Sequence, residues 1–101
     1  MPATEPVALD PYVVDVLLPD LVGHDRRPSA FLVYLYLWRH AADARRGAEA
    51  SLRAIAEGTG LSKRAVQDAV AHLERRRLVA VERRGPTAVP VYTVLKPWIR
   101  K

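Results

Sequence analysis

Apolar residues recur at helical spacing over most of residues 10–76, and from residue 78 onward they alternate with polar ones. The helical spacing predicts four helices, at about residues 11–18, 30–45, 52–57 and 62–76. The alternating segments LVAVER (78–83) and PVYTVL (90–95) predict two strands joined by a six-residue connection, which suits a hairpin. The pattern therefore predicts a mainly α chain with a small β-hairpin, an α+β fold.

Proline and capping residues place the ends of the first two predicted helices. Asp10 can cap the first helix, and Pro11 fits its opening turn. Pro19 is expected to stop or kink this helix, and residues 22–28 are expected to form a loop. Ser29 is then the expected cap of the second helix.

The second predicted helix is apolar on every face, with an uninterrupted apolar run from Ala30 to Trp38. A helix of this kind must be buried all round. Its second cover is either the N-terminal helix or another copy of the protein, which leaves open a homodimer through the N-terminal helix and the 30–45 helix. We accordingly divide the chain into an N-terminal extension, residues 1–28, which serves packing or dimerisation, and a domain over residues 29–101.

The segment that follows has the spacing of two short helices joined by a sharp turn. A serine precedes each helix, Ser51 or Ser62, and its hydroxyl can accept a backbone N–H bond. Gly60 lies where the chain must turn, and glycine tolerates a positive φ. The apolar spacing gives each helix one buried face, with Leu52, Ile55 and Ala56 in the first and Val66, Ala69, Val70 and Leu73 in the second. These features specify a helix-turn-helix, and residues 48–50 ahead of it can add a strand of one or two residues.

The face of the second helix opposite its buried stripe carries side chains that read base edges in DNA. At 100° per residue this face holds Arg64, Asp68, Ala71 and Arg75, with Gln67 on one flank and His72 on the other. Arginine favours guanine, glutamine favours adenine, and an alanine methyl can meet a thymine methyl. We assign base reading to Arg64, Gln67, Asp68 and Ala71. Asp68 either pairs with Arg64 one turn back, which we favour, or accepts from a cytosine amino group.

Charge supports a polyanionic partner for the larger part of the chain. Residues 1–28 hold five acids and two bases, whereas residues 29–101 hold fourteen bases and six acids, for net charges of −3 and +8. A basic body of this kind is typical of proteins that bind nucleic acid. The alternative is a solvated surface that is merely rich in arginine.

No constellation for catalysis or metal binding is evident in the 101 residues. The chain has no cysteine, its three histidines lack ligand spacing, and its three serines (Ser29, Ser51 and Ser62) all have a capping explanation. We therefore expect no enzyme activity, no cofactor and no metal. The longest apolar run is far shorter than the roughly 20 residues of a membrane span, so we expect a cytoplasmic, nucleoid-associated protein.

From residue 29 onward the chain resembles the winged helix-turn-helix domains of bacterial, phage and plasmid regulators and replication initiators. The resemblance rests on the run SLRAIAEGTGLSKRAVQDAVAHLERRRLV, residues 51–79, and on a basic hairpin that closes on V-Y-T-V. It implies a three-helix core, a two-stranded wing over residues 78–95 and, in this chain, an extra N-terminal helix. It also implies that residues 62–76 form the recognition helix in the major groove.

The resemblance further implies that the wing reaches phosphate or the minor groove. The residues expected to contact the DNA backbone are Arg53, Ser62, Lys63, Arg75, Arg83, Arg84 and Thr87. Two departures from the family matter. Arg77 stands where the family usually has glycine, which costs about 1 kcal/mol if the position is left-handed. Pro86 and Pro90 stiffen the wing and remove two backbone donors.

The sequence thus predicts specific binding of double-stranded DNA, most simply by a small transcription regulator. A replication or partition initiator of plasmid or phage type is the alternative within nucleic-acid binding. The alternative from another class is a winged-helix protein-interaction module whose basic face meets an acidic partner.

Overall fold

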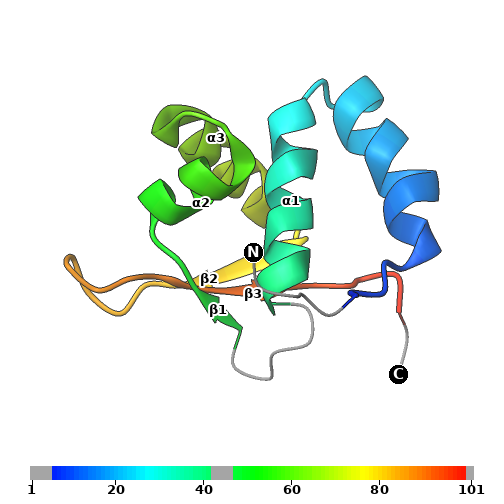
Figure 1. The fold of residues 1–101 in the computed structure, drawn as a ribbon. Coiled ribbons are helices and arrows are strands. Elements are labelled where there is room, and N and C mark those ends of the chain that lie inside the picture. The colour runs from blue at the N-terminus through cyan, green and yellow to red at the C-terminus, as the bar shows by residue number, and fades with distance from the viewer. Residues whose placement is uncertain (1–5, 42–46, 100–101) are drawn as a thin grey trace.

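The computed structural model describes residues 6–41 and 47–99. Its elements are η1 (Val13–Leu17), η2 (Pro19–His24), α1 (Pro28–Ala41), β1 (Ala48–Glu49), α2 (Leu52–Thr59), α3 (Lys63–Arg75), β2 (Val79–Glu82) and β3 (Val91–Val94). Helix α1 stands in the middle, with η1 and η2 on one side, α2 and α3 on the other, and the sheet beneath (Figure 1). The predicted mainly α fold with a small hairpin is confirmed, and its arrangement is that of a winged helix-turn-helix.

The sheet has three antiparallel strands in the order β1-β3-β2. β2 and β3 form the predicted hairpin, with Val79 opposite Val94 and Glu82 opposite Val91. β1 is the two-residue strand predicted ahead of the helix-turn-helix, and Ala48 lies opposite Tyr92. The loop between β2 and β3 extends away from the helices beyond α2, as a wing (Figure 1).

One apolar core joins the helices to the sheet. Its largest fully buried side chains include Tyr34 and Leu37 of α1, Leu73 of α3 and Tyr92 of β3. The Tyr34 hydroxyl donates to the carbonyl of Leu95 at 3.1 Å, so the buried phenol has a partner. Burial raises the pKa of Tyr34, which therefore stays neutral in the core.

The N-terminal extension stays helical across Pro19, where the sequence predicted a stop or kink. The N–H of Leu18 donates to the carbonyl of Val13, and the N–H of Asp25 to that of Asp20, so both segments are π-helical. Proline has no N–H and its ring crowds the carbonyl four residues back in an α-helix, whereas the wider π turn accommodates it. Residues 22–24, expected in a loop, therefore form the end of η2.

Helix α1 begins at Pro28, so the prediction that Ser29 caps it was wrong. Proline is favoured in the first turn of a helix because its missing N–H has no helical partner there. Ser29 lies inside that first turn. The predicted end of the helix at Arg45, followed by Arg46, lies outside the described residues.

The chain's own N-terminal segment covers α1. Val13, Leu17 and Leu21 are buried in the same core as α1. Trp38 of α1 also donates its indole N–H to the carbonyl of Ala8 at 2.9 Å. Cover of α1 therefore needs no second copy, and the homodimer stays a prediction.

Residues near the C-terminus hold the extension in place. Asp10 accepts from the N–H of Tyr12 at 3.0 Å, as expected of a helix cap, and from the indole of Trp98 at 3.0 Å. The hydrogen bond from Trp98 lowers the pKa of Asp10. The rings of Tyr12 and Trp98 stack with centroids 4.4 Å apart. The first turn of the extension is thus fixed to the segment that follows β3.

The two predicted serine caps of the helix-turn-helix are confirmed. The Ser51 hydroxyl accepts from the N–H of Ala54 at 3.0 Å, and the Ser62 hydroxyl accepts from the N–H of Ala65 at 3.0 Å. Gly60 ends α2 with φ 80°, the left-handed conformation for which glycine is suited. Local sequence rules thus place both helices of the motif.

Arg77 has φ 58°, so the position where the related domains carry glycine is indeed left-handed here. Its N–H donates to the carbonyl of Glu74 at 3.0 Å, and the N–H of Leu78 donates to that of Leu73 at 2.9 Å. This pair of bonds, with Leu73 and Leu78 both buried, is a Schellman motif. The motif turns the chain from α3 directly into β2.

Candidate nucleic-acid interface

Helix α3 presents a charged face to solvent and an apolar face to the core. Val66, Ala69, Val70 and Leu73 are buried, as predicted. On the opposite face Arg64 and Asp68 are exposed, as is Gln67 on its flank, while Ala71 is half-buried. The four side chains assigned to base reading thus lie on or beside one accessible surface.

Among the residues that the structure describes, Asp68 makes no ion pair with Arg64, so the favoured account of Asp68 gains no support from the free protein and stays a prediction. A salt bridge one turn apart on an exposed helix contributes only about 0.3 kcal/mol, which does not hold two solvated side chains together. Acceptance from a cytosine amino group is the other account of Asp68, and it stays a prediction.

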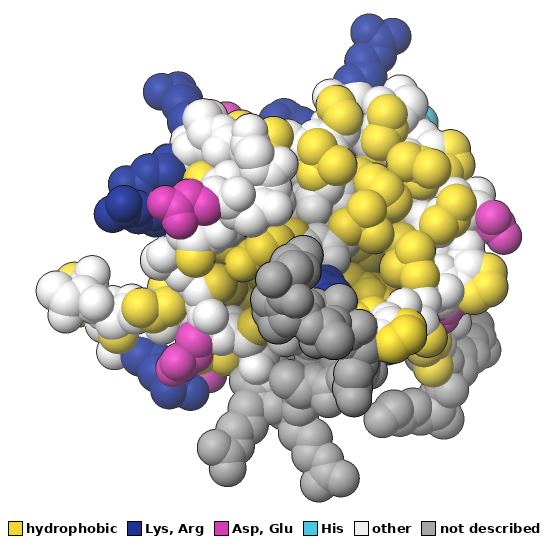
Figure 2. All heavy atoms as spheres, viewed as in Figure 1, with side chains coloured by type: hydrophobic (Ala, Val, Ile, Leu, Met, Phe, Trp, Pro, Cys, Tyr) yellow, Lys and Arg dark blue, Asp and Glu magenta, His cyan; other side chains and the backbone are white. Residues whose placement is uncertain are grey.

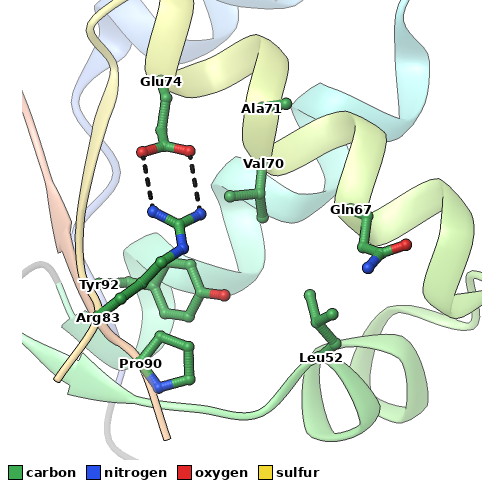
Figure 3. A pocket seen from close by; sticks show the side chains of 8 residues that line it. All are labelled: Leu52, Gln67, Val70, Ala71, Glu74, Arg83, Pro90 and Tyr92. Atoms are coloured by element: carbon green, nitrogen blue, oxygen red, sulfur yellow. Dashed lines mark hydrogen bonds and ion pairs between the residues drawn. The ribbon is translucent and has the colours of Figure 1, made fainter. Parts of the chain in front are cut away.

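A hollow of about 280 Å³ separates α3 from the wing. Figure 3 shows Gln67, Ala71 and Glu74 along its α3 side, with Leu52, Pro90 and Tyr92 opposite. Arg83 of the wing crosses this hollow, and its two terminal nitrogens donate to the two carboxylate oxygens of Glu74 at 3.3 and 3.4 Å (Figure 3). A bidentate ion pair therefore joins the wing to α3.

Three of the arginines expected to contact phosphate pair with carboxylates of their own chain. Besides the Arg83 pair, Arg53 donates to Glu57 at 3.1 Å and Arg84 to Glu82 at 3.4 Å. All three side chains are more than half exposed. Exposed pairs of this kind contribute about 0–1 kcal/mol, so a phosphate can displace the carboxylate at little cost.

A second hollow, of about 510 Å³, brings several predicted backbone contacts together. Arg53 at the start of α2, Lys63 at the start of α3, and Arg83 and Thr87 of the wing all line it. The Ser62 hydroxyl already accepts as a cap, and its O–H remains free to donate. Arg75 is exposed at the other end of α3. This hollow therefore gathers four of the seven predicted residues, and the other three, Ser62, Arg75 and Arg84, do not line it.

The N-terminal extension contacts α3 through a polar cluster that the sequence analysis did not find. Asp25 accepts from His72 Nε2 at 2.7 Å and from Arg76 Nη1, while Arg76 Nη2 donates to Asp20. The charge pattern of the sequence did contain a signal for this cluster, since an acidic extension precedes a basic body. No local rule, however, pairs residues that are about 50 positions apart.

The hydrogen bond from His24, at 2.9 Å, lowers the pKa of Asp25 well below its usual range, although burial opposes it. His72 and Arg76 act in the same direction. The same bond raises the pKa of the exposed His24. The Asp25 side chain is only 9% exposed and stays ionised beside the Arg76 guanidinium.

Ligand atoms of Asp20, His24 and Asp25 lie within 4.8 Å of one another, a spacing that a metal ion can use. The Arg76 guanidinium, however, contacts both carboxylates and already supplies their positive charge. The cluster is explained as an ion-pair link between η2 and α3. Within the described residues, no helix has the length and apolar character needed to cross a membrane.

A family model described as a helix-turn-helix domain matches residues 27–79, just over half of the chain. The match runs from the start of α1 to the start of β2 and includes the whole candidate recognition helix. Comparison with curated proteins and with solved structures gave no match.

Proposed function

The chain belongs to the helix-turn-helix domain family, and from this premise we propose that it binds double-stranded DNA with α3 in the major groove. The observation that carries the proposal is the outward face of α3, where Arg64, Gln67 and Asp68 are exposed opposite a fully apolar buried stripe. Arginine and glutamine recognise guanine and adenine through paired hydrogen bonds. Ala71 is small enough to let the helix lie deep in the groove.

We assign the DNA backbone to the basic and hydroxyl side chains around this face. They are Arg53, Ser62, Lys63, Arg75, Arg83, Arg84 and Thr87. Figure 2 shows Lys and Arg side chains gathered on the α2–α3 side and around the wing, whereas the front over α1, η1 and η2 is mostly hydrophobic. Basic side chains that gather on one side suit a duplex lying along that side.

We propose transcription regulation as the biological role and the nucleoid as its location. A replication or partition initiator would use the same surface. The genomic positions of the bound sites separate the two roles. Chromatin immunoprecipitation is expected to recover promoter regions, whereas recovery of a single origin-like site would assign the protein to replication or partition.

A fluorescence-anisotropy titration with a labelled mixed-sequence duplex tests the binding itself. We expect micromolar affinity that weakens steeply with salt, because each phosphate contact adds about 0.9 to the slope of log affinity against log salt. Absence of binding at low salt would reject the proposal and favour a protein-interaction module.

Selection from a random duplex library tests the assignment of base reading. The wild-type protein is expected to select a defined motif, and Arg64→Ala to lose preference at one base pair, worth about 1–3 kcal/mol. Arg39→Ala is the matched control, because Arg39 is an exposed arginine on α1, the helix against which the core face of α3 packs. If Arg64→Ala selects the wild-type motif, Arg64 does not read bases.

A further inference from the structure

Helix α3 has two flanks, and a different part of the chain lies against each. On one flank Glu74 holds Arg83 of the wing. On the other flank His72 and Arg76 hold Asp25 of the N-terminal extension. The recognition helix is therefore bordered by the wing on one side and by the end of η2 on the other.

The helical geometry shows that both borders lie beside the outward face. At 100° per residue and counted from Arg64, Asp68 lies at about 40° and the centre of the buried stripe at about 190°. Glu74 falls at about 280°, and His72 and Arg76 at about 80° and 120°. Asp25 is thus attached to the side of α3 opposite the wing, between the solvent face and the core.

Two arginines follow Asp25 directly. Arg26 and Arg27 are exposed, and among the described residues neither makes an ion pair, unlike Arg53, Arg83 and Arg84. Their backbone is fixed: the N–H of Arg27 donates to the carbonyl of Leu21 at 2.8 Å, and its carbonyl accepts from Ala30 at 3.0 Å. Two unpaired cationic side chains therefore stand on a short, anchored connection beside α3.

An α-helix with its side chains is about as wide as the major groove, roughly 12 Å, so whatever flanks it meets the two sugar–phosphate strands that form the groove walls. The wing can reach one strand only. The connection at residues 25–27 is the part of the chain that flanks α3 on the other side. Asp20 and Asp25, which would repel phosphate, are already paired with Arg76 and His72.

We propose that Arg26 and Arg27 form a second phosphate-binding site, which contacts the DNA strand opposite the one held by the wing. This inference rests on the proposed binding of DNA by α3. It gives the N-terminal extension a role in binding beyond the cover of α1, and Asp25 becomes the positioning residue that fixes the arginines against the recognition helix.

The salt dependence of binding tests this proposal with a labelled mixed-sequence duplex. The double variant Arg26→Gln, Arg27→Gln removes two charges. Position 26 is left-handed, φ 56°, and glutamine has a Cβ atom as arginine does, so the substitution does not relieve backbone strain as glycine would. We expect the salt slope to fall by about 1.8, since each lost phosphate contact lowers it by about 0.9. Arg26→Lys with Arg27→Lys is expected to keep the wild-type slope, and thermal unfolding by circular dichroism verifies that each variant folds.

Two controls make the result decisive. Arg39→Gln removes an exposed arginine on α1 and is expected to leave the slope unchanged, whereas Lys63→Gln is expected to lower it by about 0.9. An unchanged slope in the Arg26 and Arg27 variant, with a normal Lys63→Gln response, rejects the second site and leaves the proposed function standing. If Arg39→Gln lowers the salt slope by the same amount per charge, the second site is also rejected, because the slope then reports the overall charge of the protein and not a local contact. Failure of the wild-type protein to bind rejects both.

Discussion

Arg77 occupies a backbone conformation that is unfavourable for every residue with a Cβ atom, and no ion pair of the described residues involves it. Glycine adopts the left-handed region freely. We therefore predict that Arg77→Gly stabilises the protein by about 1 kcal/mol, measured as a higher urea midpoint at unchanged m-value.

The matched control for Arg77→Gly is Arg75→Gly. Arg75 has helical geometry in the last turn of α3, where glycine costs about 1 kcal/mol. The two substitutions remove the same side chain two positions apart and are expected to change stability in opposite directions. If both variants are less stable than the wild-type protein, the contacts of the Arg77 side chain stabilise the fold by more than the strained backbone at this position costs.

Gly58 sets how closely α2 approaches α1. A Cβ atom at this position would lie 2.2 Å from Tyr36 Cε1 and 2.9 Å from Cδ1. We predict that Gly58→Ala destabilises the protein by about 1–2 kcal/mol, because the Tyr36 ring must move from its packing beside His40.

A double-mutant cycle isolates this contact at the level of the two helices. In a Tyr36→Ala background the steric conflict is gone, and Gly58→Ala is expected to stabilise α2 by about 1 kcal/mol through its higher helix propensity. The same loss in both backgrounds would place the role of Gly58 elsewhere than at the α1–α2 crossing.

The link between η2 and α3 carries a pH dependence. The pKa of Asp25 is lower in the folded chain than the unfolded value of about 3.9, so its ionised form stabilises the fold at neutral pH. That contribution is lost as the pH falls below about 4 towards the folded pKa. We predict that Asp25→Asn costs about 2 kcal/mol at pH 7, since three charge-assisted hydrogen bonds are weakened, and much less near pH 2.

Urea unfolding at the two pH values checks this prediction, with Asp15→Asn as the control. Asp15 is exposed on η1, and it takes part in none of the ion pairs of the described residues. It should show no comparable loss. A pH-independent cost of Asp25→Asn would mean that the link is maintained by shape rather than charge.

Across the whole molecule, the features predictable from sequence are those set by neighbours along the chain. The hydroxyls of Ser51 and Ser62 each cap a helix by accepting from the backbone N–H three residues later, and Gly60 turns the chain between the two helices. Sequence reasoning missed the features that distant residues decide. Pro19 remains within a helical segment whose Leu17 and Leu21 are buried in the shared core, and Asp25 meets Arg76 across 51 positions.

A homodimer stays a prediction at this scale. Part of its premise is gone, because η1 and η2 cover α1. What remains is the exposure of three apolar side chains, Val14, Val16 and Leu32, each at least 40%. Light scattering is expected to give twice the chain mass, and Leu32→Asp to return it to the monomer. If the wild-type protein has the mass of a monomer, the homodimer is rejected and single copies bind the DNA.

In the proposed complex the DNA lies on one side of the molecule, between the wing and residues 25–27, with α3 at its centre. Amide chemical-shift mapping during titration with a mixed-sequence duplex tests that placement most directly. We predict shifts along residues 62–76, in the wing and at residues 25–27, with residues 32–40 of α1 unchanged. Shifts confined to η1 and α1, or none at saturating duplex, would contradict it.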